Sequence, residues 1–491
     1  MTKLSIASLP SLAAQVARPG YDPRDVRIGI VHLGLGAFHR AHQAVFTDEV
    51  LARDPQWGIA GVSMKTPRAT GALAQQDGLY TMLVKSRQGA SARVIGALRE
   101  TAFAGADPAA LVRRIADPAV RVVTLTVTEK GYCHDPASAR LDFGHPDIVH
   151  DLAHPDAPRS AVGMLVAAIG TRRRSGAGPL NVVCCDNLPR NGRVLEGLVG
   201  EFAIRHDAAL ADWIRDNVAF PGTMVDRIVP ATTDADVAEV ERLLGVHDAA
   251  PVVAEPFIQW VIEDRFVAAR PAWEAAGAQI VRDVEPFETM KLRLLNGSHS
   301  TLAYLGYLAG HETIAQAAAD PLLAPFVQGQ MEHEVAPSLV TPPGVRLDVY
   351  TAQLMERFRN PALPHRTRQV AMDGSQKLPQ RLLNTVRDNL AANRPIARLA
   401  LSVAGWMRYV YGTDERGQRI EVSDPLAPRY GELAAKHRDD PRAFGTALIG
   451  LETIFGRDLP AQPRFTQPVL EALSALFADG VARTVQRFDT N

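Results

Sequence analysis

The sequence predicts an α/β protein of two domains, in which a doubly wound parallel sheet is followed by a mostly α-helical domain. In the first half of the 491 residues, apolar runs without polar alternation are separated by helix-like segments. Such runs suit parallel strands that are buried on both faces. After about Pro286, helical periodicity continues almost to the end and strand patterns nearly vanish. We therefore place the two domains at residues 1–285 and 286–491.

The apolar runs expected to form strands lie at 26–33, 57–62, 121–127 and 181–185. Helical patterns between them lie at 109–116 and 161–173. The arginines at 172–174 precede Ser175-Gly176, which is typical of a helix C-terminus whose dipole they complement. In the second half the helical patterns lie at 290–308, 347–358, 376–389, 396–411 and 468–485.

Composition excludes several classes of protein. Lys+Arg 53 against Asp+Glu 54 gives a net charge of -1, so no global field attracts nucleic acid or an anionic membrane. Three cysteines are too few for a disulfide framework. The N-terminal segment lacks the apolar run of a signal peptide, and no stretch approaches the roughly 18 apolar residues of a spanning helix. We expect a cytoplasmic protein.

A glycine turn follows the first predicted strand. Gly34-Leu35-Gly36 precedes a helical pattern that begins with Ala37-Phe38. In a dinucleotide site the first glycine permits the tight turn, and the second lets the backbone approach the pyrophosphate at the helix N-terminus. His39 occupies the position of the third glycine, so helix–strand packing is the alternative interpretation. We assign Gly34, Leu35, Gly36, Ala37 and Phe38 to the cofactor site of a Rossmann-like domain.

The residue that would read the ribose is harder to identify. After the second strand, an Asp or Glu would accept the 2′-hydroxyl of NAD. This sequence has Lys65, Thr66, Pro67 and Arg68 there. The two cations are either solvated or accommodate the 2′-phosphate of NADP. NAD is the first choice, and NADP stays open.

The segment 288–299 carries three polar side chains suited to catalysis. On an α-helix, at 100° per residue, His299 lies about 80° and Asn296 about 140° round from Lys291. A lysine in an apolar cleft loses its charge readily and serves as an acid or base. Asn296 suits an oxyanion donor, and His299 suits a residue that orients a hydroxyl. Glu288 is a salt-bridge partner or a proton route; the alternative for the whole segment is a structural role.

Five motifs resemble the polyol-specific long-chain dehydrogenases, a family that contains mannitol 2-dehydrogenase and fructuronate reductase. They are V-H-L-G-L-G-A-F-H-R-A-H-Q at 31–43, T-V-T-E-K-G-Y-C at 126–133, C-D-N-L-P at 185–189, F-P-G-T-M-V-D-R at 220–227 and K-x4-N-x2-H at 291–299. They span nearly the whole chain in the family's order.

The resemblance implies metal-free hydride transfer, dependent on NAD(P), between a secondary alcohol and a ketone. Lys291 is similar to the family's general acid/base, and Asn296 and Asn187 to the pair that holds the alkoxide. His299 is similar to a residue that orients the substrate. No metal signature is present, because His311-Glu312-Thr313-Ile314-Ala315 lacks the second His of H-E-x-x-H.

Other positions resemble substrate contacts. Asp226 and Lys377 are similar to residues that contact the sugar chain. The segments 365–381 and 129–132 look more like fructuronate reductases than mannitol dehydrogenases. A uronate carries a carboxylate, which favours Arg or Lys. The candidates for that contact, which are otherwise structural ion-pair residues, are Arg366, Arg368, Arg381 and Lys130.

We therefore predict reversible reduction of D-fructuronate to D-mannonate with NADH. The alternative within the family is a mannitol 2-dehydrogenase or another polyol oxidoreductase. A more distant alternative is a non-catalytic nucleotide-binding protein on the same fold. The expected partner is a small sugar acid or polyol, without nucleic acid or membrane, and the resemblance implies a monomer.

Overall fold

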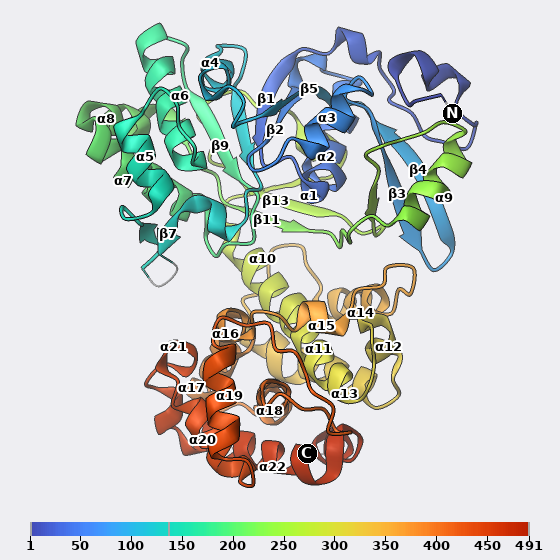
Figure 1. Ribbon diagram of the computed structural model, residues 1–491, viewed down its shortest axis with the longest axis vertical. Helices are drawn as coiled ribbons and strands as arrows, with labels where there is room; N and C mark the ends of the chain where they lie inside the picture. Colours follow the sequence, from blue (N-terminus) through green and yellow to red (C-terminus); the bar gives the residue numbers. More distant parts are fainter. Residues whose placement is uncertain (1, 136–137, 490–491) are drawn as a thin grey trace. The chain divides into compact units, whose positions relative to one another are not determined.

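The computed structural model describes residues 2–135 and 138–489 (Figure 1). The chain divides into two compact units, Met1–Glu285 and Pro286–Asn491. The first unit contains a parallel sheet with helices, and the second is helical. The predicted fold class is confirmed.

Six parallel strands form the main sheet of the first unit. They are β1 (Ile28–Leu33), β2 (Gly58–Ser63), β5 (Leu98–Phe103), β6 (Val122–Leu125), β9 (Leu180–Cys184) and β10 (Val218–Ala219). Their order is β10-β9-β6-β1-β2-β5. From β1 the chain first builds one side of the sheet and then the other, so the topological switch point lies between β1 and β6.

Successive side chains of β1 enter two different cores. Val31 and Leu33 belong to a core with apolar residues of α4, α6 and α7, whereas Ile30 packs in a second core with α2. Both faces of the strand are therefore buried, which explains its unbroken apolar run. The helices of this unit are α1 (Ala37–Ala41), α2 (Gln43–Leu51), α3 (Arg68–Ala74), α4 (Pro108–Ala116), α5 (Pro146–Ala153), α6 (Ala161–Ser175), α7 (Asn191–His206), α8 (Ala208–Asn217) and α9 (Asp234–Leu244).

Three smaller sheets were not predicted. They are β11-β13-β14 (Thr223–Asp226, Gln259–Glu263, Gln279–Val281), β12-β3-β4 (Val252–Ala254, Tyr80–Ser86, Gly89–Ile95) and β7-β8 (His134–Asp135, Arg140–Leu141). Several of their strands have only two or three residues, and the first half of β4 is exposed. A strand so short or so polar has no apolar periodicity that the sequence can reveal.

The arginines at 172–174 end α6, as predicted. Gly176 caps this helix in the left-handed conformation (φ 68°). Arg172 is fully buried, and its guanidinium donates to carbonyl oxygens that include those of Ile115, Val120 and Pro179. These bonds join the ends of α4 and α6, so Arg172 has a structural role.

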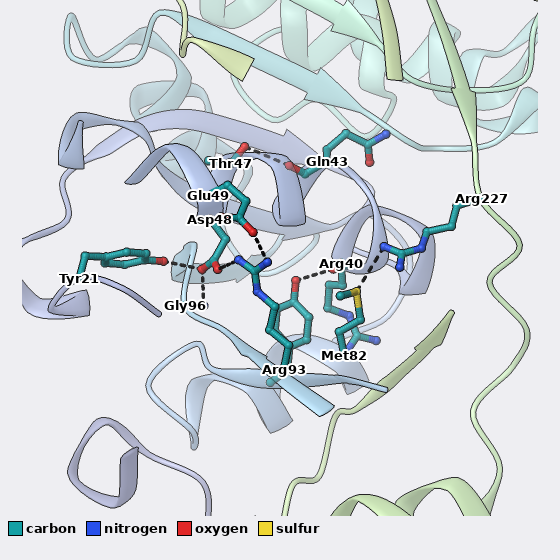
Figure 2. A network of polar contacts seen from close by, with 11 residues as sticks. Tyr21, Arg40, Gln43, Thr47, Asp48, Glu49, Met82, Arg93, Gly96 and Arg227 are labelled. Atoms are coloured by element: carbon teal, nitrogen blue, oxygen red, sulfur yellow. Dashed lines mark hydrogen bonds and ion pairs between the residues drawn. The ribbon is translucent and has the colours of Figure 1, made fainter. Parts of the chain in front are cut away.

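A polar network holds α2 in the first unit (Figure 2). The buried carboxylate of Asp48 accepts hydrogen bonds from the Tyr21 hydroxyl (2.6 Å), the Gly96 amide (2.8 Å) and the Arg93 guanidinium (2.6 Å). Arg93 also pairs with Glu49. A buried charge is tolerated only when it is paired and hydrogen-bonded, and this network meets both conditions. It anchors α2, the second helix after the glycine turn.

The second unit is helical. Within its described residues, β-pairing is limited to two isolated bridges, Thr313 with Arg366 and Thr413 with Arg419. Its α-helices are α10 (Glu285–Met290), α11 (Ser298–Leu308), α12 (Ile314–Ala319), α13 (Leu323–Gly329), α14 (Leu347–Phe358), α15 (Thr367–Val370), α16 (Gly374–Leu378), α17 (Asn384–Ala391), α18 (Ala397–Val410), α19 (Ala427–Lys436), α20 (Pro441–Ile449), α21 (Glu452–Phe455) and α22 (Pro463–Asp489). Across the described residues of both units, no helix is long and apolar enough to cross a membrane.

Three π-helical segments occur in this unit, and two of them correct predicted helices. Lys291–Gly297 is a π-helix between α10 and α11, and Pro379–Leu383 is another between α16 and α17. The third is Gln330–Val335. The ranges 290–308 and 376–389 are therefore not continuous α-helices. Apolar spacing hardly distinguishes a π-turn from an α-turn, so the sequence could not show this.

Candidate active site

Gly34 is required by the fold of the glycine turn itself. Its φ of 102° lies in the region that favours glycine, and a Cβ atom there would meet the carbonyl oxygen of Thr126 at 2.1 Å. Its amide donates to the Val62 carbonyl (2.8 Å). Gly34 thus lets the chain leave β1 between the ends of β6 and β2.

Gly36 differs, because nothing in the described protein crowds it. The nearest atom to a Cβ at this position would be the Gly34 carbonyl oxygen, at 3.7 Å. The space in front of Gly36 is open, as a pyrophosphate that approaches the backbone requires. Leu35 is buried, and Ala37 and Phe38 begin α1. This turn fits a dinucleotide.

The helix after the turn is short. α1 ends at Ala41, and His42 (φ -129°, ψ -90°) interrupts the helix before α2 begins. A single short helix carries little macrodipole. The amides of the turn, more than a long helix, are therefore what this site offers to a phosphate.

His39 stands where the third glycine of the motif would be. Its ring stacks on that of His32 in β1, with 3.4 Å between centroids. His32 in turn contacts the Thr124 hydroxyl (2.8 Å) and the Thr126 hydroxyl (3.0 Å). Burial lowers the pKa of His32 to about 3 and that of His39 well below its usual range. Two neutral rings thus fill the helix–strand contact that a glycine would otherwise close.

The end of β2 carries no acid. Lys65 is exposed in the loop after Ser63, and Arg68 is the exposed first residue of α3. The Ser63 hydroxyl donates to the Thr66 carbonyl (2.5 Å) and closes this loop. The sequence-based choice of NAD over NADP gains no support from this loop.

Asn187 and Asp226 lie at the ends of two strands of the first unit, Asn187 after β9 and Asp226 at the end of β11. Asn187 is exposed in the bend after β9, and Asp226 is the buried last residue of β11. The next residue, Arg227, donates to the carbonyl oxygens of Ala41 (2.6 Å) and Glu255 (2.8 Å). Burial lowers the pKa of Arg227 to about 10. These bonds fix the backbone beside Asp226.

Lys291 and Asn296 lie on the first π-helical segment of the second unit. In a π-helix residue i is hydrogen-bonded to residue i+5, so two residues five apart fall on nearly the same side. The predicted angle of about 140° between them, which assumed an α-helix, is therefore wrong. Lys291 is 7% exposed and His299 is 8% exposed. The π-helical segment therefore places Lys291 and Asn296 nearer to the same side of the helix than an α-helix would.

His299 is buried among aromatic rings of the second unit, and several cationic side chains lie near it. Its ring stacks on Phe358 (5.3 Å between centroids) and meets His365 edge-on (4.8 Å). Burial lowers its pKa well below the usual range, and the charges of His365, Arg381, Arg357 and Lys377 lower it further. His299 Nε2 is buried with no hydrogen-bond partner among the described residues. A neutral imidazole with an open nitrogen, beside cations, suits a polar anionic ligand.

The predicted cations have different surroundings. Arg381 donates to the Ser300 hydroxyl (3.1 Å) and to the Asn296 carbonyl (3.4 Å), so it also holds the first π-helical segment. Lys377 donates to the Met372 carbonyl (2.5 Å). Arg366 is exposed at the start of α15, and Arg368 pairs loosely with Glu421 (3.6 Å) on the surface. Lys130 is exposed in the first unit.

The sequence analysis missed Arg357 and His365. Arg357 lies in the last turn of α14, and His365 precedes α15. Both are far from the K-x4-N-x2-H motif in the chain, and only the tertiary fold brings them to His299. The one available signal was that His365 begins the segment that resembles fructuronate reductases.

One group of possible metal ligands appears among the described residues, outside these sites. Ligand atoms of Cys133, His145 and Asp147 lie within 4.8 Å of one another. His145 Nδ1 already accepts a hydrogen bond from the Asp147 amide (3.2 Å). Burial and the charge of Asp147 raise the pKa of the Cys133 thiol to about 11. The His145 contact caps α5, so we read this trio as structural.

Comparison with known proteins agrees with both units. The mannitol dehydrogenase Rossmann domain matches residues 28–275, and the mannitol dehydrogenase C-terminal domain matches residues 283–477. The chain is 46% identical to the D-mannonate oxidoreductase of Escherichia coli over 490 residues, which cover 99% of each protein. It is 48% identical to the uncharacterized oxidoreductase YeiQ of the same organism, over 95% of this chain and 96% of that protein.

A solved structure is similar over the full length. It is the Pseudomonas fluorescens mannitol 2-dehydrogenase in a ternary complex with NAD and D-mannitol, with a TM-score of 0.89, 38% identity and 100% of each chain covered. These matches confirm the resemblance that the five motifs indicate. The chain belongs to the mannitol dehydrogenase family of oxidoreductases.

Proposed function

We propose that this enzyme interconverts D-fructuronate and D-mannonate with NAD as cofactor. The observation that carries the proposal is the buried His299, whose Nε2 has no hydrogen-bond partner among the described residues and whose surroundings include the charges of Arg381, Arg357 and Lys377. A uronate carboxylate is bound well by such cations, whereas a polyol has no charge to match them. The 46% identity to the D-mannonate oxidoreductase supports the same choice.

The turn at Gly34–Phe38 would hold the cofactor through its amides and the open space at Gly36. The nicotinamide supplies the hydride acceptor or donor when it is bound. The similarity to a mannitol 2-dehydrogenase bound to NAD supports this cofactor. Preference for NADP would instead involve Lys65 or Arg68.

Lys291 acts as the general base for oxidation and as the general acid for reduction in this proposal. Lys291 is largely buried, and a positioned amine can exchange a proton with a substrate hydroxyl. When mannonate is oxidised, the hydroxyl proton passes to Lys291 as the C–H hydride leaves. The side-chain amides of Asn296 and Asn187 donate to the alkoxide, and His299 orients a neighbouring hydroxyl. Asp226, Lys377 and Arg366 contact the rest of the sugar chain.

Oxidation of D-mannitol to a ketose is the second candidate. The 38% identity and the TM-score of 0.89 to a mannitol 2-dehydrogenase favour it. The two candidate substrates differ by one carboxylate. Binding of the sugar acid would need the cations around His299, whereas binding of the polyol would not.

A substrate panel tests the proposal. Initial rates of NADH or NADPH consumption and formation would be measured with fructuronate, tagaturonate, fructose and mannitol. We expect the highest kcat/KM for fructuronate with NADH. A higher kcat/KM for fructose or mannitol would overturn the substrate assignment, and preference for NADPH would overturn the cofactor.

A further inference from the structure

The carboxylate of Asp186 joins two loops at the ends of neighbouring strands. Asp186 follows β9 and directly precedes Asn187. Its side chain accepts hydrogen bonds from the amides of Val127 (2.9 Å) and Thr128 (3.0 Å) and from the Tyr132 hydroxyl (2.6 Å). All three donors belong to the loop after β6. One carboxylate thus fixes this loop against the segment after β9 that contains Asn187.

The loop held by Asp186 is strained at Thr128. This residue has φ 68° and ψ 160°, a conformation that is essentially restricted to glycine. A β-branched side chain is especially unfavourable there. The Thr128 amide donates to Asp186, and its carbonyl accepts from the Gly131 amide (2.9 Å). Such a conformation persists only where surrounding bonds impose it, and it is found most often at functional sites.

The backbone of Asp186 is held from the opposite side by Asn191. The Asn191 side-chain amide donates to the carbonyl oxygens of Asp186 (3.0 Å) and Thr223 (2.9 Å), and its oxygen accepts from the Thr223 amide (2.9 Å). The Thr223 hydroxyl donates to the Cys184 carbonyl (2.6 Å). Thr223 begins β11, the strand that ends at Asp226. The network therefore links the ends of β6 and β9 to the start of β11.

We propose that Asp186 is a positioning residue for the reaction, which acts by fixing the backbone that aims Asn187. This inference rests on the proposed function, in which Asn187 donates to the alkoxide. Asn187 is the exposed residue that directly follows Asp186 in the bend after β9. Its neighbour is bonded through both its side chain and its carbonyl, and these bonds define where the Asn187 amide lies. A displacement of about 1 Å in a reacting group can cost about 100-fold in rate.

The test compares Asp186→Asn with Asp151→Asn. Asp151 is a matched control, because its carboxylate also accepts from two amides (Arg159, 2.7 Å; Ser160, 2.8 Å) and one hydroxyl (Ser160, 2.7 Å), but at the start of α6. In each variant an amide group replaces an acceptor oxygen and faces a donor. We expect both to lower the Tm, but only D186N to lower kcat, by about 10- to 100-fold. The Kd for NADH should change by less than about twofold. A D186N enzyme with wild-type kcat would overturn the proposal.

A double-mutant cycle separates positioning from a general loss of structure. If Asp186 acts through Asn187, D186N should lower kcat no further in an N187A background, within about twofold. Multiplicative losses would overturn the inference. If N187A alone keeps the wild-type kcat, the proposed role of Asn187 fails, and the inference fails with it for that separate reason.

A milder variant covers the case in which D186N does not fold. Tyr132→Phe removes one of the three donors and leaves both amide bonds in place. We expect kcat to fall by about 3- to 10-fold, again without a further loss in the N187A background. An unchanged kcat in Y132F would count against the proposal.

Discussion

In both units the candidate site residues lie on irregular backbone, but the two units stabilise that backbone in different ways. In the first unit these residues lie on loops at strand ends. There, side chains such as Asp186 and Arg227 form hydrogen bonds with backbone amides and carbonyls. In the second unit Lys291 and Asn296 lie on a π-helix, which bonds much of its own backbone, buries Leu294 and Leu295 in the core and takes one added bond from Arg381. A loop needs polar anchors because it has no repeating hydrogen bonds, whereas a widened helix can be fixed by apolar packing.

The largest expected effect comes from removing Lys291, the proposed acid/base of the second unit. Replacing Lys291 with Ala should lower kcat by about 100- to 10,000-fold, because a positioned acid/base is lost. The Kd for NADH, measured by fluorescence titration, should stay within about twofold. Lys436→Ala, at an exposed position in α19, is the control and should keep full activity. Full turnover in K291A would contradict the mechanism.

The two glycines of the first unit should separate folding from cofactor binding. Gly34→Ala should destabilise the protein by several kcal/mol, because its Cβ would meet the Thr126 carbonyl and its φ is positive. Gly36→Ala should change stability little but raise the Kd for NADH by about tenfold or more. Urea unfolding and NADH titration measure the two effects. Unchanged NADH binding in G36A would show that the open space there is not used by the cofactor.

Arg357→Gln tests whether the positive charge near His299 in the second unit recognises a substrate carboxylate. Loss of a charge-assisted hydrogen bond to a carboxylate should lower kcat/KM for fructuronate by about 10- to 100-fold and leave that for fructose nearly unchanged. Arg368→Gln is the matched control, since Arg368 is 59% exposed. Equal losses with both substrates would mean that Arg357 does not distinguish acid from polyol.

A smaller effect should appear in both units as the pH falls. Burial lowers the pKa of His32 and His39 in the first unit and of His299 and His365 in the second. Below about pH 6.5 these imidazoles take up protons in the unfolded chain but stay neutral in the folded protein. Their contribution is therefore complete above pH 6.5 and is lost as the pH falls, by at most about 1.4 kcal/mol per pH unit for each ring.

Urea unfolding at pH 7.5, 6.5 and 5.5 measures this loss. His299→Gln should make the pH dependence shallower in the second unit. His206→Gln, at an exposed position in the first unit, should leave the dependence unchanged. Stability that rises between pH 6.5 and 5.5 would contradict the assignment of neutral buried rings.

Prediction from the sequence worked best where the pattern is local and repeated. The unbroken apolar run of β1 reflects burial on both faces, and the arginines before Gly176 mark the end of α6. It failed at Lys291–Gly297, because α- and π-turns bury nearly the same apolar positions. It also gave Asp186 no role, although this residue lies in the C-D-N-L-P motif, because its partners Val127 and Tyr132 are remote in the chain.

The sequence by itself determined the family, the fold class and the motif residues, since each depends on neighbours in the chain or on a spacing that can be read directly. Only the tertiary structure decided that Gly34 is required by the fold while Gly36 is open, and that Arg357 and His365 join His299. These facts depend on distances between residues that are remote in the chain. Such distances are set by how the elements pack, and no local pattern encodes them.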